Sequence, residues 1–93
     1  MPHIDKHNRT ITINRGFVIE NKFFFGFIQG ELYRLPYMIG GRYYPMKKVP
    51  KKTLPNGWEY YRIRRTKFSR SRVEAMCKQV EWQVEANIDL PTA

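Results

Sequence analysis

The stretch GWEYYRIRRTKFSRSRVEAM, residues 57–76, decides the fold because a strand pattern changes into a helix pattern within it. Aromatic residues and arginines alternate in its first half, which predicts one β-strand over residues 58–68. Tyr61 and Ile63 share one face of that strand, and we expect them to pack against the helix that follows. The other face is aromatic and cationic, and we expect it to be open. It carries Trp58, Tyr60, Arg62, Arg64 and Thr66.

The helix is predicted from apolar residues that recur at its period. They are Val73, Met76, Cys77, Val80 and Val84. Two serines are candidate caps: Ser71 forms a capping box with Glu74, whereas Ser69 would let Phe68 pack onto the first turn. Either start lies within two residues of position 70, so we expect a helix over residues 70–87.

Two further antiparallel strands are predicted upstream, at residues 32–39 and 42–49. The Gly-Gly pair between them can adopt positive φ twice and close a two-residue turn. Pro36 and Pro45 each remove a backbone donor, which places them at a bulge or on an outward-facing edge. The segment KVPKKTLPNG, residues 48–57, is predicted to be a basic connecting loop.

These elements together predict a single α+β domain. We expect an antiparallel sheet of three main strands over residues 31–68, preceded by an N-terminal hairpin and packed against one C-terminal helix. Residues 1–9 are polar and unpatterned and are expected to form a flexible arm, which leaves residues 10–93 for the domain. A chain of 93 residues can build one modest core.

Positive charge is concentrated in one third of the chain. The net charge is +9 at pH 7, and residues 42–72 hold eleven basic residues against one acid, Glu59. Such an uneven field is expected to attract a polyanion, with nucleic acid first and an acidic membrane surface or an acidic protein second. The alternative interpretation is a solvated face that only keeps the protein in solution.

We predict that the open face of the strand reads DNA bases. Arginine can hold guanine O6 and N7 with two hydrogen bonds, and tryptophan and tyrosine offer flat apolar surface. The basic residues on either side are predicted to hold phosphates. They are Lys47, Lys48, Lys51, Lys52, Arg65, Lys67, Arg70 and Arg72. The structural alternative is that the arginines cover half-buried aromatic pairs and need no ligand.

The junction KFSRSRVEAMCKQVEW, residues 67–82, resembles the DNA-binding domain of the Apetala and ethylene-response-factor type. It is also similar to the related arm-binding domains of phage tyrosine recombinases, and the resemblance covers roughly residues 31–87. In that family a three-stranded sheet lies in the major groove. The resemblance therefore implies base contacts by Arg62, Arg64 and Trp58.

Patterns typical of catalysis are absent from the sequence. There is no nucleophile elbow, phosphate loop or zinc-ligand spacing, and His3 and His7 lie in the polar arm. Cys77 is the one cysteine, so we expect a buried small apolar side chain rather than a disulfide. We therefore expect no enzymatic activity, no cofactor, no metal and no small-molecule substrate.

The expected function is that of a DNA-binding protein, a transcription or recombination accessory factor of a phage or mobile element. Double-stranded DNA is the expected partner, and no apolar run predicts a membrane span. The expected location is the cytoplasm, associated with the nucleoid, or the nucleus in a eukaryote. Two alternatives stay open: an inhibitor or adaptor whose basic face meets an acidic protein, and a single-stranded RNA binder.

Overall fold

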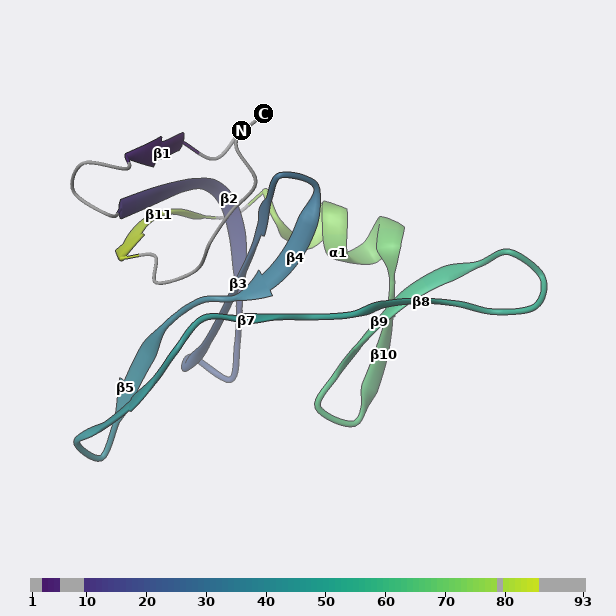
Figure 1. Cartoon of the computed structure of the whole chain (residues 1–93). Coiled ribbons are helices and arrows are strands. Elements are labelled where there is room, and N and C mark those ends of the chain that lie inside the picture. The colour runs from purple at the N-terminus through teal and green to yellow at the C-terminus, as the bar shows by residue number, and fades with distance from the viewer. Residues whose placement is uncertain (1–2, 6–9, 79, 86–93) are drawn as a thin grey trace.

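The computed structural model describes residues 3–5, 10–78 and 80–85, and Figure 1 shows the path of the chain. Antiparallel strands make up most of the described residues, which also contain one short helix. In chain order the elements are β1 (His3–Asp5), β2 (Thr10–Ile19), β3 (Phe23–Ile28), β4 (Glu31–Arg34), β5 (Tyr37–Ile39), β6 (Arg42–Tyr44), β7 (Lys47–Lys48), β8 (Lys51–Thr53), β9 (Glu59–Ile63), β10 (Thr66–Ser69), α1 (Arg70–Met76) and β11 (Val80–Glu85). The predicted α+β class is confirmed.

The strands of the described residues form three sheets. The largest has the order β1-β2-β3-β4-β7, and β11 pairs with β2 beside that path. A three-stranded sheet has the order β10-β9-β8, and a two-stranded ribbon joins β5 to β6. In Figure 1 the β5–β6 ribbon and the β8–β9 hairpin extend away from the body on opposite sides.

The predicted N-terminal hairpin is present as β2 and β3, and the Gly-Gly hairpin is present as well. The composition of the three-stranded sheet differs from the prediction. Pro36 and Pro45 divide the predicted pair of strands, so that β4 and β7 join the large sheet while β5 and β6 pair by themselves. The segment predicted to be a loop at residues 48–57 contributes β8 and forms a hairpin with β9.

The prediction of one strand over residues 58–68 was wrong. The register pairs Ile63 with Thr66, so Arg64 and Arg65 form a two-residue turn between β9 and β10. Arg64 has φ +59, in the left-handed region that turns favour, although neither residue is glycine. Because the chain reverses here, Thr66 lies on the same side of the sheet as Ile63 and not on the predicted open face.

The helix is shorter than predicted. It begins at Arg70, where the Ser69 side chain accepts a hydrogen bond from the Arg72 backbone N–H at 3.2 Å, and it ends at Met76. Residues 80–85 of the predicted helix form strand β11, which pairs with β2. The sequence VEWQVE over this strand also alternates apolar and polar residues, so its apolar positions satisfy a period of two as well as a helical stripe.

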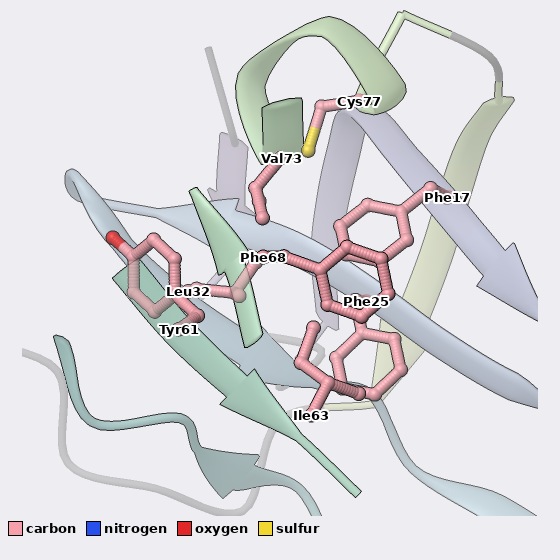
Figure 2. Close-up of a cluster of buried hydrophobic side chains, with 8 residues drawn as sticks. All are labelled: Phe17, Phe25, Leu32, Tyr61, Ile63, Phe68, Val73 and Cys77. Carbon is pink, nitrogen blue, oxygen red and sulfur yellow. The ribbon is translucent and has the colours of Figure 1, made fainter. Parts of the chain in front are cut away.

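The core lies between the two larger sheets, with α1 covering one end (Figure 2). It contains Phe17, Phe25, Leu32, Tyr61, Ile63, Phe68, Val73 and Cys77. Tyr61 and Ile63 therefore face the core as predicted, and Cys77 is buried as predicted. No helix within residues 3–5, 10–78 and 80–85 is long and apolar enough to cross a membrane.

Candidate nucleic-acid interface

The three-stranded sheet has one face against the core and one face in solvent, which we name the open face. Directly paired residues of antiparallel strands project to the same side. The register pairs Tyr60 with Lys52 on one neighbouring strand and with Ser69 on the other, and it pairs Arg62 with Lys67. The open face therefore consists of Lys52, Leu54, Trp58, Tyr60, Arg62, Lys67 and Ser69.

Leu54 and Trp58 extend the open face beyond the regular strands. The Leu54 backbone N–H donates to the Trp58 carbonyl at 2.8 Å, and the Asn56 side chain accepts a hydrogen bond from the Trp58 N–H at 3.1 Å. These bonds close the turn at Gly57, which has φ +89. The Trp58 side chain is left 62% exposed, whereas tryptophan side chains in folded proteins are highly buried on average.

A groove of about 350 Å³ crosses this part of the open face. Its lining includes Leu54, Trp58, Tyr60 and Lys67, and Glu59 also contributes to it. The Lys67 Nζ lies 5.4 Å from the centre of the Tyr60 ring, a cation–π contact that places the ammonium group over that ring. The groove thus combines apolar and aromatic residues with one cationic residue, Lys67, and one acidic residue, Glu59.

On the face of β9 toward the helix the charges are paired. The Glu59 carboxylate accepts hydrogen bonds from Lys51 Nζ at 2.6 Å and from Arg70 Nη1 at 3.3 Å. The hydrogen bond from Lys51 is the main cause that lowers the pKa of Glu59, and the charge of Arg70 adds to it. Arg70 Nε also donates to Glu74 at 3.0 Å, so both cations are neutralised on this side of the sheet.

Cations without an acidic partner gather on the open face. Each carboxylate whose side chain is described takes part in an ion pair, and none of these pairs involves Lys52, Arg62 or Lys67. The carboxylates are those of Glu20, Glu31, Glu59 and Glu74. The open face is therefore positive in its own right and is the part of the sheet best suited to an anionic partner.

Four of the predicted site residues are engaged elsewhere. Lys51 and Arg70 hold Glu59, and Lys48 binds Glu31 at 2.8 Å, which raises the pKa of the lysine through that hydrogen bond. Arg64 forms an ion pair with Glu20, and its guanidinium carbon lies 4.9 Å from the centre of the Phe23 ring. The turn thus directs Arg64 toward the β2–β3 hairpin and away from Arg62.

The remaining predicted residues lie around the sheet. Trp58, Tyr60, Arg62, Lys52 and Lys67 are brought together on the open face. Arg65 is exposed in the turn after β9, Thr66 is exposed on the core side of β10, and Lys47 is exposed on β7. Arg72 lies over the Phe68 ring, with 4.8 Å between its guanidinium carbon and the ring centre.

Sequence reasoning missed Leu54 and Ser69. Leu54 is one of the exposed large apolar residues, and it stands opposite Trp58 because residues 54–58 form a hairpin turn. The signal was present in the Pro-Asn-Gly sequence at the end of the predicted loop, flanked by Lys51–Thr53 on one side and β9 on the other. Ser69 was considered only as a helix cap.

The described residues contain no group of three or more histidine, cysteine, aspartate or glutamate side chains that could hold a metal ion. Comparisons with known proteins give no further guidance: no protein-family model, no curated protein and no solved structure matches this chain.

Proposed function

We propose that this protein binds double-stranded DNA through the open face of its three-stranded sheet and that it has no enzymatic activity. The observation that supports the proposal is the separation of charge across β9. Glu59 and its two cations lie on one side, and Lys52, Arg62 and Lys67 lie on the other without an acidic partner among the described side chains. Unpaired cations on one surface repel one another, and a polyanion relieves that repulsion.

The dimensions of the sheet suit the major groove. Neighbouring strands are about 4.8 Å apart, so three strands measure about 10 Å across their backbones. The major groove of B-DNA is about 12 Å wide. In this arrangement Arg62, on the central strand, reaches base edges and donates to guanine O6 and N7, while Lys52 and Lys67 on the flanking strands approach the phosphates.

The aromatic and apolar part of the open face has a separate role in the proposal. Trp58 and Leu54 present exposed apolar surface beside the cations, which suits the thymine methyl group or the deoxyribose rings. A small protein with such a surface is suited to the role of a transcription or recombination accessory factor of a phage or mobile element, and this role is part of the proposal.

The test is fluorescence anisotropy of a labelled 20-base-pair random-sequence duplex at several salt concentrations. The two phosphate contacts proposed for Lys52 and Lys67 give a slope of log K against log salt of about −1.8, and each further contact would add about −0.9. We expect a slope of this size, and we expect single-stranded RNA of equal length to compete poorly. A slope near zero, or no binding at low salt, contradicts the proposal and favours an acidic protein partner.

Single-stranded RNA is the second candidate because of the groove beside Tyr60. Base stacking on an aromatic side chain contributes about 1–3 kcal/mol per base, and Trp58 is exposed enough to accept one. The same competition experiment separates the candidates, since RNA that displaces the duplex at equal concentration would make RNA the preferred ligand.

A further inference from the structure

The β5–β6 ribbon is a separate projection of the chain. It is a two-stranded sheet whose strands bond to no other strand in the described structure, and Pro36 and Pro45 interrupt the pairing on either side of its base. Leu35 and Met46, next to these prolines, are buried in the body. Figure 1 shows the ribbon extending away from the sheets, and residues 38–43 at its end are exposed.

Aromatic contacts hold the base of the ribbon. The Tyr37 and Tyr44 rings are stacked, with 4.7 Å between their centres and an angle of 7° between their planes. Phe23 of the large sheet meets Tyr37 edge to face at 5.6 Å. Arg34 lies over the Tyr37 ring at 5.3 Å and donates to the Pro45 carbonyl at 3.2 Å. These contacts fix the direction in which the ribbon projects.

The end of the ribbon is apolar and cationic. Met38 is 68% exposed, and Ile39 and Tyr43 are 42% and 47% exposed, which leaves three large apolar side chains in solvent next to the Gly-Gly turn. Arg42 pairs with Ile39, and its guanidinium carbon lies 5.4 Å from the centre of the Tyr44 ring. No acidic residue occurs from position 32 to position 58, so the ribbon carries positive charge alone.

We propose that the β5–β6 ribbon is a second DNA contact that enters the minor groove, places Met38 or Ile39 against a base step and bends the duplex. This inference rests on the proposed function. Charge complementarity selects DNA over a second copy of this chain, because two ribbon ends brought together would oppose like charges of Arg42. Apolar side chains inserted between base pairs from a cationic minor-groove element are a known physical route to a kink.

The size of the ribbon agrees with this placement. Three residues of a strand extend about 10 Å, which exceeds the minor-groove depth of about 7.5 Å. Its two backbone axes are about 4.8 Å apart and side chains project from both faces, so the ribbon as a whole is broader than a groove about 6 Å wide. The groove must therefore open, and a bend toward the major groove opens it.

The experiment measures energy transfer between fluorophores at the two ends of a 30-base-pair duplex with a central TA step. The protein is the full chain at saturating concentration and low salt. We expect the wild type to raise the transfer efficiency. The Met38→Ser/Ile39→Ser double variant should saturate the duplex, as anisotropy shows, and lose most of that rise. Both side chains are exposed, and circular dichroism checks that the variant keeps its fold.

Two controls give the result its meaning. Arg62→Ala should need more protein to saturate the duplex but reach the wild-type transfer efficiency, because Arg62 lies on the open face and not on the ribbon. A minor-groove ligand such as netropsin should suppress the rise while the protein stays bound.

Three outcomes would overturn the inference. Saturated DNA with unchanged transfer efficiency removes the bending role and leaves the proposed function standing. A double variant that bends DNA as the wild type does removes the role of the apolar residues. Failure of the wild type to bind duplex DNA overturns this inference together with the proposed function.

Discussion

Glu59 and Tyr60 are neighbours in strand β9, and they project to opposite faces of the three-stranded sheet. Glu59 binds Lys51 and Arg70 on the side of the helix, whereas Tyr60 lies under Lys67 on the open face. Because successive side chains of a strand point to opposite faces, the ion-paired charges around Glu59 and the cations without an acidic partner near Tyr60 lie on different faces of the sheet. Because both sets are rich in cations, variants that remove one cation from each face can distinguish a specific surface from a general effect of net charge.

Arg62 and Arg64 are the first such pair. Arg62→Ala should weaken binding to a preferred DNA sequence by about 1–3 kcal/mol and reduce discrimination among sequences, because a base contact is lost. Arg64→Ala should change DNA affinity much less, because Arg64 is in an ion pair with Glu20 and lies on the Phe23 ring. Anisotropy titrations of both variants against several duplexes measure the difference. Equal losses would show that charge alone governs binding.

Lys51 and Lys52 are adjacent residues of β8 that point to opposite faces. Lys52→Ala should weaken binding to all sequences alike and make the slope of log K against log salt less steep by about 0.9, the value for one phosphate contact. Lys51→Ala removes a cation that Glu59 already neutralises, so its effect on the slope should be smaller. Slopes that shift by the same amount in both variants would argue against the open face as the phosphate-binding surface.

Substitution of Gly26 can test how closely strands β2 and β3 pack. It pairs with Gly16 of β2, and a Cβ atom at Gly26 would overlap the Cγ2 methyl of Ile13, a buried side chain with a stiff χ1. Gly26→Ala should lower the free energy of unfolding by about 1–3 kcal/mol, measured by urea denaturation. Ile13→Ala removes the overlapping methyl, so the double variant should lose less stability than the sum of the two single variants. Additive losses would contradict this packing.

Local alternation and turn chemistry were enough to predict the class, the hairpins before residue 50 and the burial of Tyr61 and Ile63. The two turns that shape the open face were harder to predict. The turn at Arg64 and Arg65 contains no glycine, the residue that usually marks such a turn in a sequence. The left-handed conformation of Arg64 is supported by its contacts with Glu20 and Phe23, which are distant in sequence. The alternating sequence pattern therefore runs on past residue 64, although the chain reverses direction there. Contacts with distant residues support that turn.

The C-terminal error has a different physical cause. Val80 and Val84 extend the helical stripe of Val73 and Cys77, but they also alternate with polar residues as in a strand. The first half of strand β2 offers backbone N–H and C=O groups along one edge, and β11 forms its hydrogen bonds with them. The pairing partner lies some seventy residues away in sequence, so the local pattern could not decide between the two structures. The segment from residue 86 onward lies outside the described residues.

Cys77 gives a prediction for stability at high pH. Burial raises the pKa of its thiol from the ordinary value of 9.0 to about 11, and the Glu74 carboxylate adds to this shift. Above pH 9 the unfolded chain loses the thiol proton while the folded protein keeps it, so the unfolded state binds fewer protons and unfolding becomes more favourable. The free energy of unfolding should therefore fall between pH 9 and pH 11, by roughly 2–3 kcal/mol from this group.

The Cys77→Ala variant isolates the contribution of the thiol. Burial also raises the pKa of Tyr61, which makes stability fall with pH in both proteins, so the difference between them is the quantity to measure. Urea denaturation at half-unit steps from pH 7 to pH 11 should give a constant difference in unfolding free energy up to about pH 8, where the thiol is protonated in both states. Above that pH the wild type should lose stability faster than the variant. Parallel curves over the whole range would mean that the thiol ionises as readily in the fold as in the unfolded chain, and that α1 does not keep Cys77 away from water.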